Sequence, residues 1–90
     1  MDSTIENYLG SILVDVSRFK TGIGESCLTF SHRNNLYMIV YNLNYILTIN
    51  GKYVLITSSP SRLVEVLKLI LNGYSYEPDE FTRLIAQYKS

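Results

Sequence analysis

The chain has 90 residues, of which 47% are hydrophobic and 18% charged, and its eight basic residues balance its eight acidic ones. This length allows one domain with a modest core, residues 1–90, and zero net charge favours neither nucleic acid nor an acidic mimic of it as the mode of action. The single cysteine, Cys27, excludes an internal disulfide framework and a thiolate metal cluster.

The chain shows no membrane or export signal. No stretch reaches the roughly 18 uninterrupted apolar residues of a membrane span. The first residues lack the basic region and apolar run of a signal peptide. We therefore expect a soluble protein of the cytoplasm, with no membrane partner.

Residues 3–20 are predicted to form the first helix. Ser3 and Glu6 match a capping box, in which each side chain bonds the backbone N–H of the other residue. The apolar residues recur at the spacing of one helix face: Ile5, Tyr8, Leu9, Ile12, Leu13, Val16 and Phe19. The segment 21–24 contains two glycines and is expected to end this helix and lead into a sheet.

Three residue pairs, eight residues apart, predict turns in the middle of the chain: Asn34-Asn35, Asn42-Leu43 and Asn50-Gly51. Asn and Gly tolerate the positive φ that a type I′ hairpin turn requires. The intervening segments are rich in strand-forming residues and predict strands over 26–32, 36–41, 44–49 and 52–57. Because Leu disfavours positive φ, the alternative is one bent strand over 36–49, which would give a sheet of three strands.

The last third of the chain is predicted to be helical. Ser59 is a suitable N-cap with Pro60 at the first helical position, and Asn72-Gly73 predicts the C-terminus of this helix. A third helix is predicted from about Pro78 to Tyr88, with a docking face of Phe81, Leu84, Ile85 and Tyr88. The predicted fold class is therefore α+β, an antiparallel four-stranded meander with one N-terminal and two C-terminal helices.

Two-residue turns would fix which side chains share a face of the sheet. One face, expected to be the core beneath the helices, collects Cys27, Thr29, Leu36, Met38, Val40, Tyr45, Leu47, Ile49, Val54 and Ile56. The opposite face collects Leu28, Phe30, His32, Tyr37, Ile39, Tyr41, Ile46, Thr48, Tyr53 and Leu55. Both faces are apolar, whereas a sheet with one solvated side alternates apolar and polar residues. Three explanations stay open: helices on both faces, a homodimer of stacked aromatic faces, or a binding surface for a different partner.

The aromatic face supplies the candidate site. The chain has eight tyrosines and no tryptophan, and tyrosine buries area at interfaces while keeping a polar tip. The predicted partner-binding residues are Phe30, Tyr37, Tyr41 and Tyr53 on this face, with Tyr74 and Tyr76 between the last two helices. They predict a protein-binding module, expected to be a homodimer.

A small nucleic-acid-binding protein is the alternative function. Phe30, Tyr37, Tyr41 and Tyr53 could stack unpaired bases on one sheet face. Phosphate neutralisation supplies most of the affinity of such proteins, and only Arg33 and Lys52 lie near the predicted sheet ends. The sequence therefore favours a protein partner.

No residue pattern indicates catalysis, a metal site or a cofactor. His32 and Cys27 are five residues apart on one strand, so they are expected on opposite faces and do not form a catalytic pair. The glycines of 21–26 follow a predicted helix, whereas phosphate-binding loops follow a strand. We expect a protein that is not an enzyme and binds no cofactor.

The order of one helix, a small antiparallel sheet and two helices resembles that of small phage anti-CRISPR inhibitors, over nearly the whole chain. The resemblance implies a non-enzymatic inhibitor of phage or mobile-element origin that occupies the surface of a host defence protein in the host cell cytoplasm. Because this chain is neutral and cannot act as an acidic DNA mimic, the expected contact is apolar and tyrosine-rich.

Overall fold

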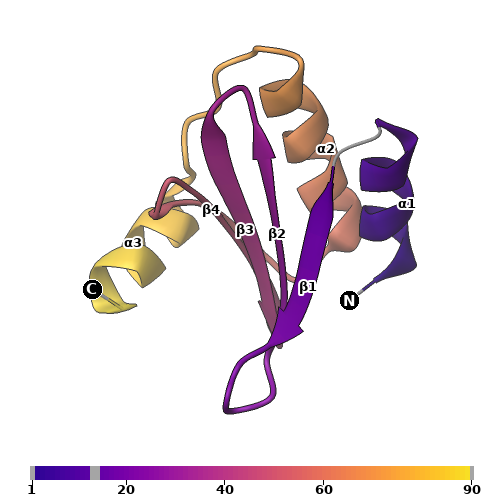
Figure 1. Ribbon diagram of the computed structural model, residues 1–90. Coiled ribbons are helices and arrows are strands. Elements are labelled where there is room, and N and C mark those ends of the chain that lie inside the picture. The colour runs from indigo at the N-terminus through magenta and orange to yellow at the C-terminus, as the bar shows by residue number, and fades with distance from the viewer. Residues whose placement is uncertain (1, 13–14, 90) are drawn as a thin grey trace.

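The computed structural model describes residues 2–12 and 15–89. Its helices and strands are α1 (Ser3–Ser11), β1 (Val16–Lys20), β2 (Ser26–His32), β3 (Asn35–Asn42), β4 (Asn44–Ile49), β5 (Lys52–Thr57), α2 (Pro60–Leu71) and α3 (Glu80–Lys89). Within these residues five antiparallel strands form one meander in the order β1-β2-β3-β4-β5. Figure 1 shows α1 and α2 together on one side of the sheet and α3 on the other. The α+β class is confirmed, with one strand more than predicted.

The extra strand comes from the segment that was predicted to continue the first helix. α1 ends at Ser11, and residues 16–20 form β1, which pairs with β2 from Val16↔Phe30 to Lys20↔Ser26; residues 13–14 of the predicted helix lie outside the described residues. Val16 and Phe19 fit the spacing of one helix face. Residues 16–20 instead form the backbone hydrogen bonds of a hairpin with β2. A three-residue loop closes this hairpin, with Gly24 at φ 86° and the Thr21 N–H donating to the Glu25 carbonyl over 3.0 Å.

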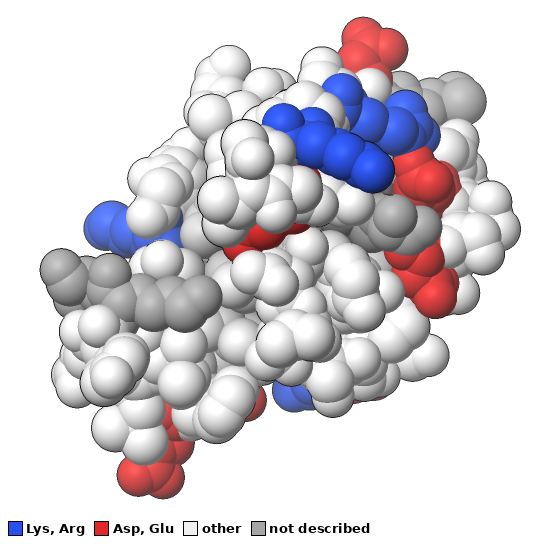
Figure 2. Space-filling view, turned by 90° about the horizontal axis from the view of Figure 1, so that it is seen from below, with Lys and Arg blue, Asp and Glu red and all other residues white. Residues whose placement is uncertain are grey.

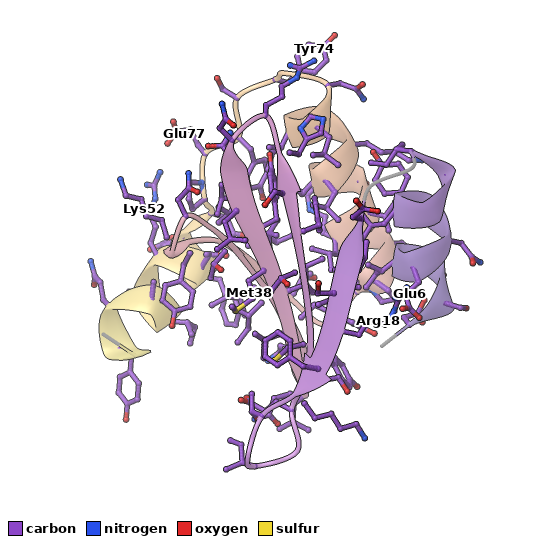
Figure 3. The ribbon with its side chains drawn as sticks, in the orientation of Figure 1. Glu6, Arg18, Met38, Lys52, Tyr74 and Glu77 are labelled. Carbon is purple, nitrogen blue, oxygen red and sulfur yellow. The ribbon has the colours of Figure 1, made fainter. Side chains whose placement is uncertain are left out.

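The predicted capping box of α1 was also wrong. The N-cap is Asp2, whose carboxylate accepts from the Thr4 N–H at 2.7 Å. Glu6 is therefore free to reach out of the helix, and it forms an ion pair with Arg18 of β1. The two labelled side chains point toward one another in Figure 3. This contact ties α1 to the outermost strand of the sheet.

The four strands predicted between residues 26 and 57 are confirmed, and the three-strand alternative is wrong because the chain reverses at Leu43 to pair Tyr41 with Tyr45. The β4–β5 turn has Asn50 at φ 52° and Gly51 at φ 83°, as a type I′ turn requires. The Asn50 side chain adds a link between hairpins, because its Oδ1 accepts from the Leu36 N–H at 2.9 Å.

The predicted division of side chains between the two faces was wrong, because two register changes intervene. At the β3–β4 turn Asn42 pairs with Asn44, which leaves one residue, Leu43, between the strands instead of two. The β4–β5 register then shifts between Leu47 and Thr48. Each one-residue slip moves a strand's side chains to the other face. The predicted core residues Cys27, Thr29, Leu36, Met38 and Val40 consequently lie on the face turned away from α1 and α2.

The core lies between the sheet and the α1–α2 pair. The sheet contributes a row of cross-strand neighbours, Leu28, Ile39, Leu47 and Leu55, none more than 1% exposed. The helices contribute Ile5, Leu9, Leu63, Val66 and Leu67. Removing large side chains from such fully buried positions typically costs about 2–5 kcal/mol each, so this single layer holds the fold together.

α2 begins and ends as the sequence predicts. The Ser59 hydroxyl accepts from the Arg62 N–H at 3.2 Å, and Pro60 occupies the first helical position. Gly73, at φ 91°, and Tyr74 donate to the carbonyls of Ile70 and Leu69, both over 3.0 Å. These two bonds are those of a Schellman motif.

α3 docks through a different face from the one predicted. Phe81, Leu84 and Tyr88 are exposed, whereas Thr82 is fully buried and Ile85 is half-buried. The reason is a polar contact at the sheet edge, where the Ile56 N–H of β5 donates to Thr82 Oγ1 over 3.1 Å. A buried backbone N–H needs a hydrogen-bond acceptor. The bond from Ile56 to Thr82 therefore turns the Thr82 face of α3 toward β5.

The carboxylate of Asp79 is expected to make the stability of α3 depend on pH. It accepts from the Thr82 N–H at 2.8 Å, and the backbone and side chain of Thr82 together lower the pKa of Asp79 below its ordinary value of 3.8. A lowered folded-state pKa gives stability that is present above the ordinary value and lost as pH falls through the folded one. Asp79→Asn, which keeps a capping oxygen, should lose less stability than the wild type between neutral pH and pH values below 3.8. Urea unfolding of the wild type and the variant at neutral pH and below pH 3.8 measures how much stability each loses. Equal losses in the two proteins would contradict the prediction.

Candidate protein-binding surface

The face of the sheet turned away from α1 and α2 is covered by α3 only in part. Two parallel rows of cross-strand neighbours make up this outer face: Phe19, Cys27, Val40, Ile46 and Ile56, and beside them Ser17, Thr29, Met38, Thr48 and Tyr53. On β4 and β5, Ile46 and Ile56 are buried on the side where α3 packs. On β1 to β3 no described helix covers the face.

The uncovered part carries apolar side chains that face solvent. We call it the open face and define it by Phe19, Thr29, Leu36, Met38 and Val40. Phe19 is 47% exposed and Leu36 is 50% exposed, while the other three are half-buried. In Figure 3 Met38 lies near the middle of the sheet. Apolar residues on one continuous strand surface typically mark an interaction site.

α3 presents a second exposed apolar surface. Phe81, Leu84 and Tyr88 recur at the spacing of one helix face, and Tyr88 is 91% exposed. We call these three residues the α3 stripe. A helix face of this kind, left out of the core, is a usual element of recognition by helix-in-groove contacts.

The β1–β2 loop and the β3–β4 turn form a third exposed region. Ile23 of the β1–β2 loop and Leu43 of the β3–β4 turn are both exposed and line a hollow of about 290 Å³ together with Tyr41. Asn42 Nδ2 donates to Glu25 Oε2 over 3.0 Å and joins the two hairpins. Leu43 has φ 66°, a conformation that costs a non-glycine residue free energy.

The six residues predicted to bind a partner do not share one surface. Phe30 and Tyr37 are each 3% exposed and stack at a centroid distance of 4.7 Å inside the core. Tyr41 is exposed and packs at 4.6 Å against the buried Tyr45. Tyr53 is half-buried on β5. The proposed aromatic platform is therefore absent from the described surface, because its central pair belongs to the core.

The two remaining tyrosines lie in the link between α2 and α3. Tyr74 is 67% exposed. Tyr76 is half-buried against the core, and the Arg62 guanidinium lies 5.9 Å from its ring centroid. A cation over an aromatic face stabilises such a contact, so Tyr76 fastens the link to α2 whereas Tyr74 is accessible.

Sequence reasoning missed the residues of the open face. Phe19 was assigned to a helix, and Leu36, Met38 and Val40 were assigned to the core by the register error. One signal was present in the sequence. The two glycines in 21–24 also fit the loop of a hairpin that follows a short strand.

Among the described residues, Cys27 and His32 lie in different surroundings. Cys27 is buried, and burial followed by the nearby Glu25 charge raises the pKa of its thiol, which keeps it protonated and weakly nucleophilic at neutral pH. His32 lies edge-on to the Tyr37 ring at 6.5 Å. Within the described residues no three His, Cys, Asp or Glu side chains are grouped to hold a metal ion.

Three ion pairs join charged side chains among the described residues. Arg62 bonds Glu65 and Arg83 bonds Glu77, in addition to the pair between α1 and β1. Figure 2, which views the molecule from below, shows several Lys and Arg side chains at one margin beside Asp and Glu and a broad area of other residues elsewhere. No continuous basic groove of the kind that tracks a phosphate backbone is visible in this view.

No protein-family model matches the chain, and comparisons with curated proteins and with solved structures give no significant match. Among the described helices, none is long and apolar enough to span a membrane. The class that the described residues define is an α+β protein with a five-stranded antiparallel meander, whose core lies on one side beneath α1 and α2 and whose other side is covered in part.

Proposed function

We propose that the protein is a non-catalytic binding module that acts by occupying the surface of a partner protein, and that the open face and the α3 stripe make the contact. The observation that carries the proposal is the half-covered outer face, where Phe19 and Leu36 remain about half exposed, on a sheet whose other face carries the core beneath α1 and α2. Interface cores are enriched in aromatic residues and Met and depleted of charge, and the open face has this composition.

The structure offers less support to the other functions that the sequence left open. Stacking of unpaired bases would need Phe30 and Tyr37 at the surface, and both are buried. A homodimer of stacked aromatic faces would also need Phe30 and Tyr37 at the surface. A second copy that binds through the open face would be detected by light scattering of the purified protein as a mass of twice 10.3 kDa.

The biological setting that we propose is inhibition of a host defence protein by a phage or mobile-element protein. Its support is the element order shared with small phage anti-CRISPR inhibitors, to which β1 adds a strand. The balanced charge of the chain supports an apolar contact with a host protein over mimicry of nucleic acid.

The test compares capture of host proteins by the wild type and by two matched double variants. Phe19→Ser with Leu36→Ser changes the open face, and Leu69→Ser with Tyr74→Ser changes exposed apolar residues on and next to α2. We expect the open-face variant to lose about tenfold or more of the captured partner, because a few apolar anchors carry most interface energy, and the control to keep it.

Circular dichroism establishes that both variants are folded. Equal capture by the folded open-face variant and the wild type would overturn the proposal, and so would a wild type that is monomeric and captures nothing.

A further inference from the structure

The two edges of the sheet differ in how their backbone groups are satisfied. On β5 the outward N–H of Ile56 is bonded to Thr82 of α3, so a helix covers that edge. On β1 no described residue bonds the backbone along the outer side. An uncovered edge strand is a template for pairing with another chain, and proteins use such edges to bind extended peptides.

The hydrogen bond at the base of the hairpin shows which groups of β1 point outward. The Thr21 N–H donates to the Glu25 carbonyl, and the Glu25 N–H donates to the Thr21 hydroxyl, so the backbone groups of Thr21 and Glu25 face each other across the hairpin. Hydrogen-bonded and non-hydrogen-bonded pairs alternate along antiparallel strands. Phe19 and Ser17 therefore bond β2, and the N–H and C=O groups of Val16, Arg18 and Lys20 point away from the sheet.

The side chains of β1 carry positive charge along this edge and line a hollow beside it. Arg18 and Lys20 extend on the side of the sheet that carries α1, and Phe19 extends on the open face. Arg18 has Glu6 as its ion-pair partner, and Lys20 has none among the described residues. A hollow of about 320 Å³ adjoins the edge, lined by Glu6, Arg18, Phe19, Lys20, Ser26, Cys27 and Leu28.

A second copy of the chain fits this edge poorly. Antiparallel pairing of two β1 strands about Arg18 would place the two Arg18 side chains directly opposite each other. Pairing about Phe19 would place Arg18 opposite Lys20. Like charges directly opposite are destabilising, whereas a carboxylate opposite either residue would be favourable. Lys20, which has no ion-pair partner among the described residues, therefore favours an acidic strand over a basic one.

We propose that the outer edge of β1 binds an extended acidic segment of a partner protein as a sixth strand. The segment bonds the outward groups of Val16, Arg18 and Lys20 and places a carboxylate opposite Arg18 or Lys20. Its apolar side chains lie beside Phe19, at the border of the open face. This inference rests on the proposed protein-binding function and specifies where that partner is held.

Two blocked hexapeptides test the edge directly, one alternating glutamate with valine and the other alternating lysine with valine. Amide NMR shifts and hydrogen exchange of the full chain report binding residue by residue. We expect the glutamate peptide to shift the amides of Val16, Arg18 and Lys20, to slow their exchange, and to bind about tenfold more tightly than the lysine peptide.

Three variants separate backbone pairing from charge. Arg18→Pro removes one outward N–H, which an edge strand tolerates, and should abolish binding of both peptides. Arg18→Ala keeps that N–H and should weaken the glutamate peptide only in part. Arg18→Glu with Lys20→Glu should reverse the preference so that the lysine peptide binds more tightly.

Shifts confined to Leu36 and Met38, unchanged exchange along β1, or no peptide preference would overturn the edge proposal. A partner captured by the wild type, lost by the Phe19→Ser, Leu36→Ser variant and kept by folded Arg18→Pro would overturn it as well, while the proposed function would stand. If the peptides bind as expected but the wild type captures no protein, the proposed function fails and the edge retains only its affinity for acidic strands.

Discussion

Replacing Tyr37 by alanine is expected to lower the free energy of unfolding by about 3–5 kcal/mol, the usual cost of deleting a buried aromatic side chain. Tyr37 is 3% exposed and stacks on Phe30, its cross-strand neighbour, with ring planes 8° apart. Truncation removes both rings' contact and leaves a cavity beside Ile39. Since small domains are stable by about 5–15 kcal/mol, the variant should unfold at a much lower urea concentration.

Tyr74→Ala is the matched control for this result. Its side chain is 67% exposed, and changes at such positions usually alter stability by less than about 0.5 kcal/mol. The two variants compare a tyrosine in the core with a tyrosine at the surface of the same chain. Similar midpoints for the two variants in urea unfolding would mean that the Phe30–Tyr37 stack is not part of the core.

Thr82→Val is expected to lower the free energy of unfolding by about 1–3 kcal/mol, although the two side chains have nearly the same shape. The reason is the Ile56 N–H, which donates to Thr82 Oγ1 in a buried contact. Valine leaves this donor without an acceptor, so the full cost of removing it from water remains. The expected observations are a lower unfolding midpoint and faster hydrogen exchange at the Ile56 amide.

Thr82→Ser separates the hydroxyl from the methyl group of the same side chain. Serine keeps the acceptor and loses one methyl group, worth about 0.8 kcal/mol when buried. Exchange at the Ile56 amide should therefore stay slow in this variant. If valine and serine had the same effect on that amide, α3 would be held by apolar packing and the β5 edge would not depend on Thr82.

The sequence alone determined the elements whose causes are local. Asn50-Gly51 adopts the positive φ values that its residues tolerate best, and β2, β4 and β5 occupy the predicted ranges. Ser59, Pro60 and Gly73 delimit α2 for reasons confined to its own ends. For this turn and for both ends of α2, the decisive interaction joins residues within one turn or cap, so inspection of the sequence suffices.

Tertiary structure decided what depends on partners distant in sequence. Val16 and Phe19 have the spacing of a helix face, but pairing with β2 made residues 16–20 a strand, in which the two side chains lie on opposite faces. The one-residue turn at Leu43 decided which side chains of β4 share a face with the buried Tyr37 and which share one with Met38, because a side-chain period of two turns a one-residue difference into an exchange of faces. The orientation of α3 followed from one hydrogen bond to Ile56, a contact between segments 26 residues apart in the chain that no local pattern specifies.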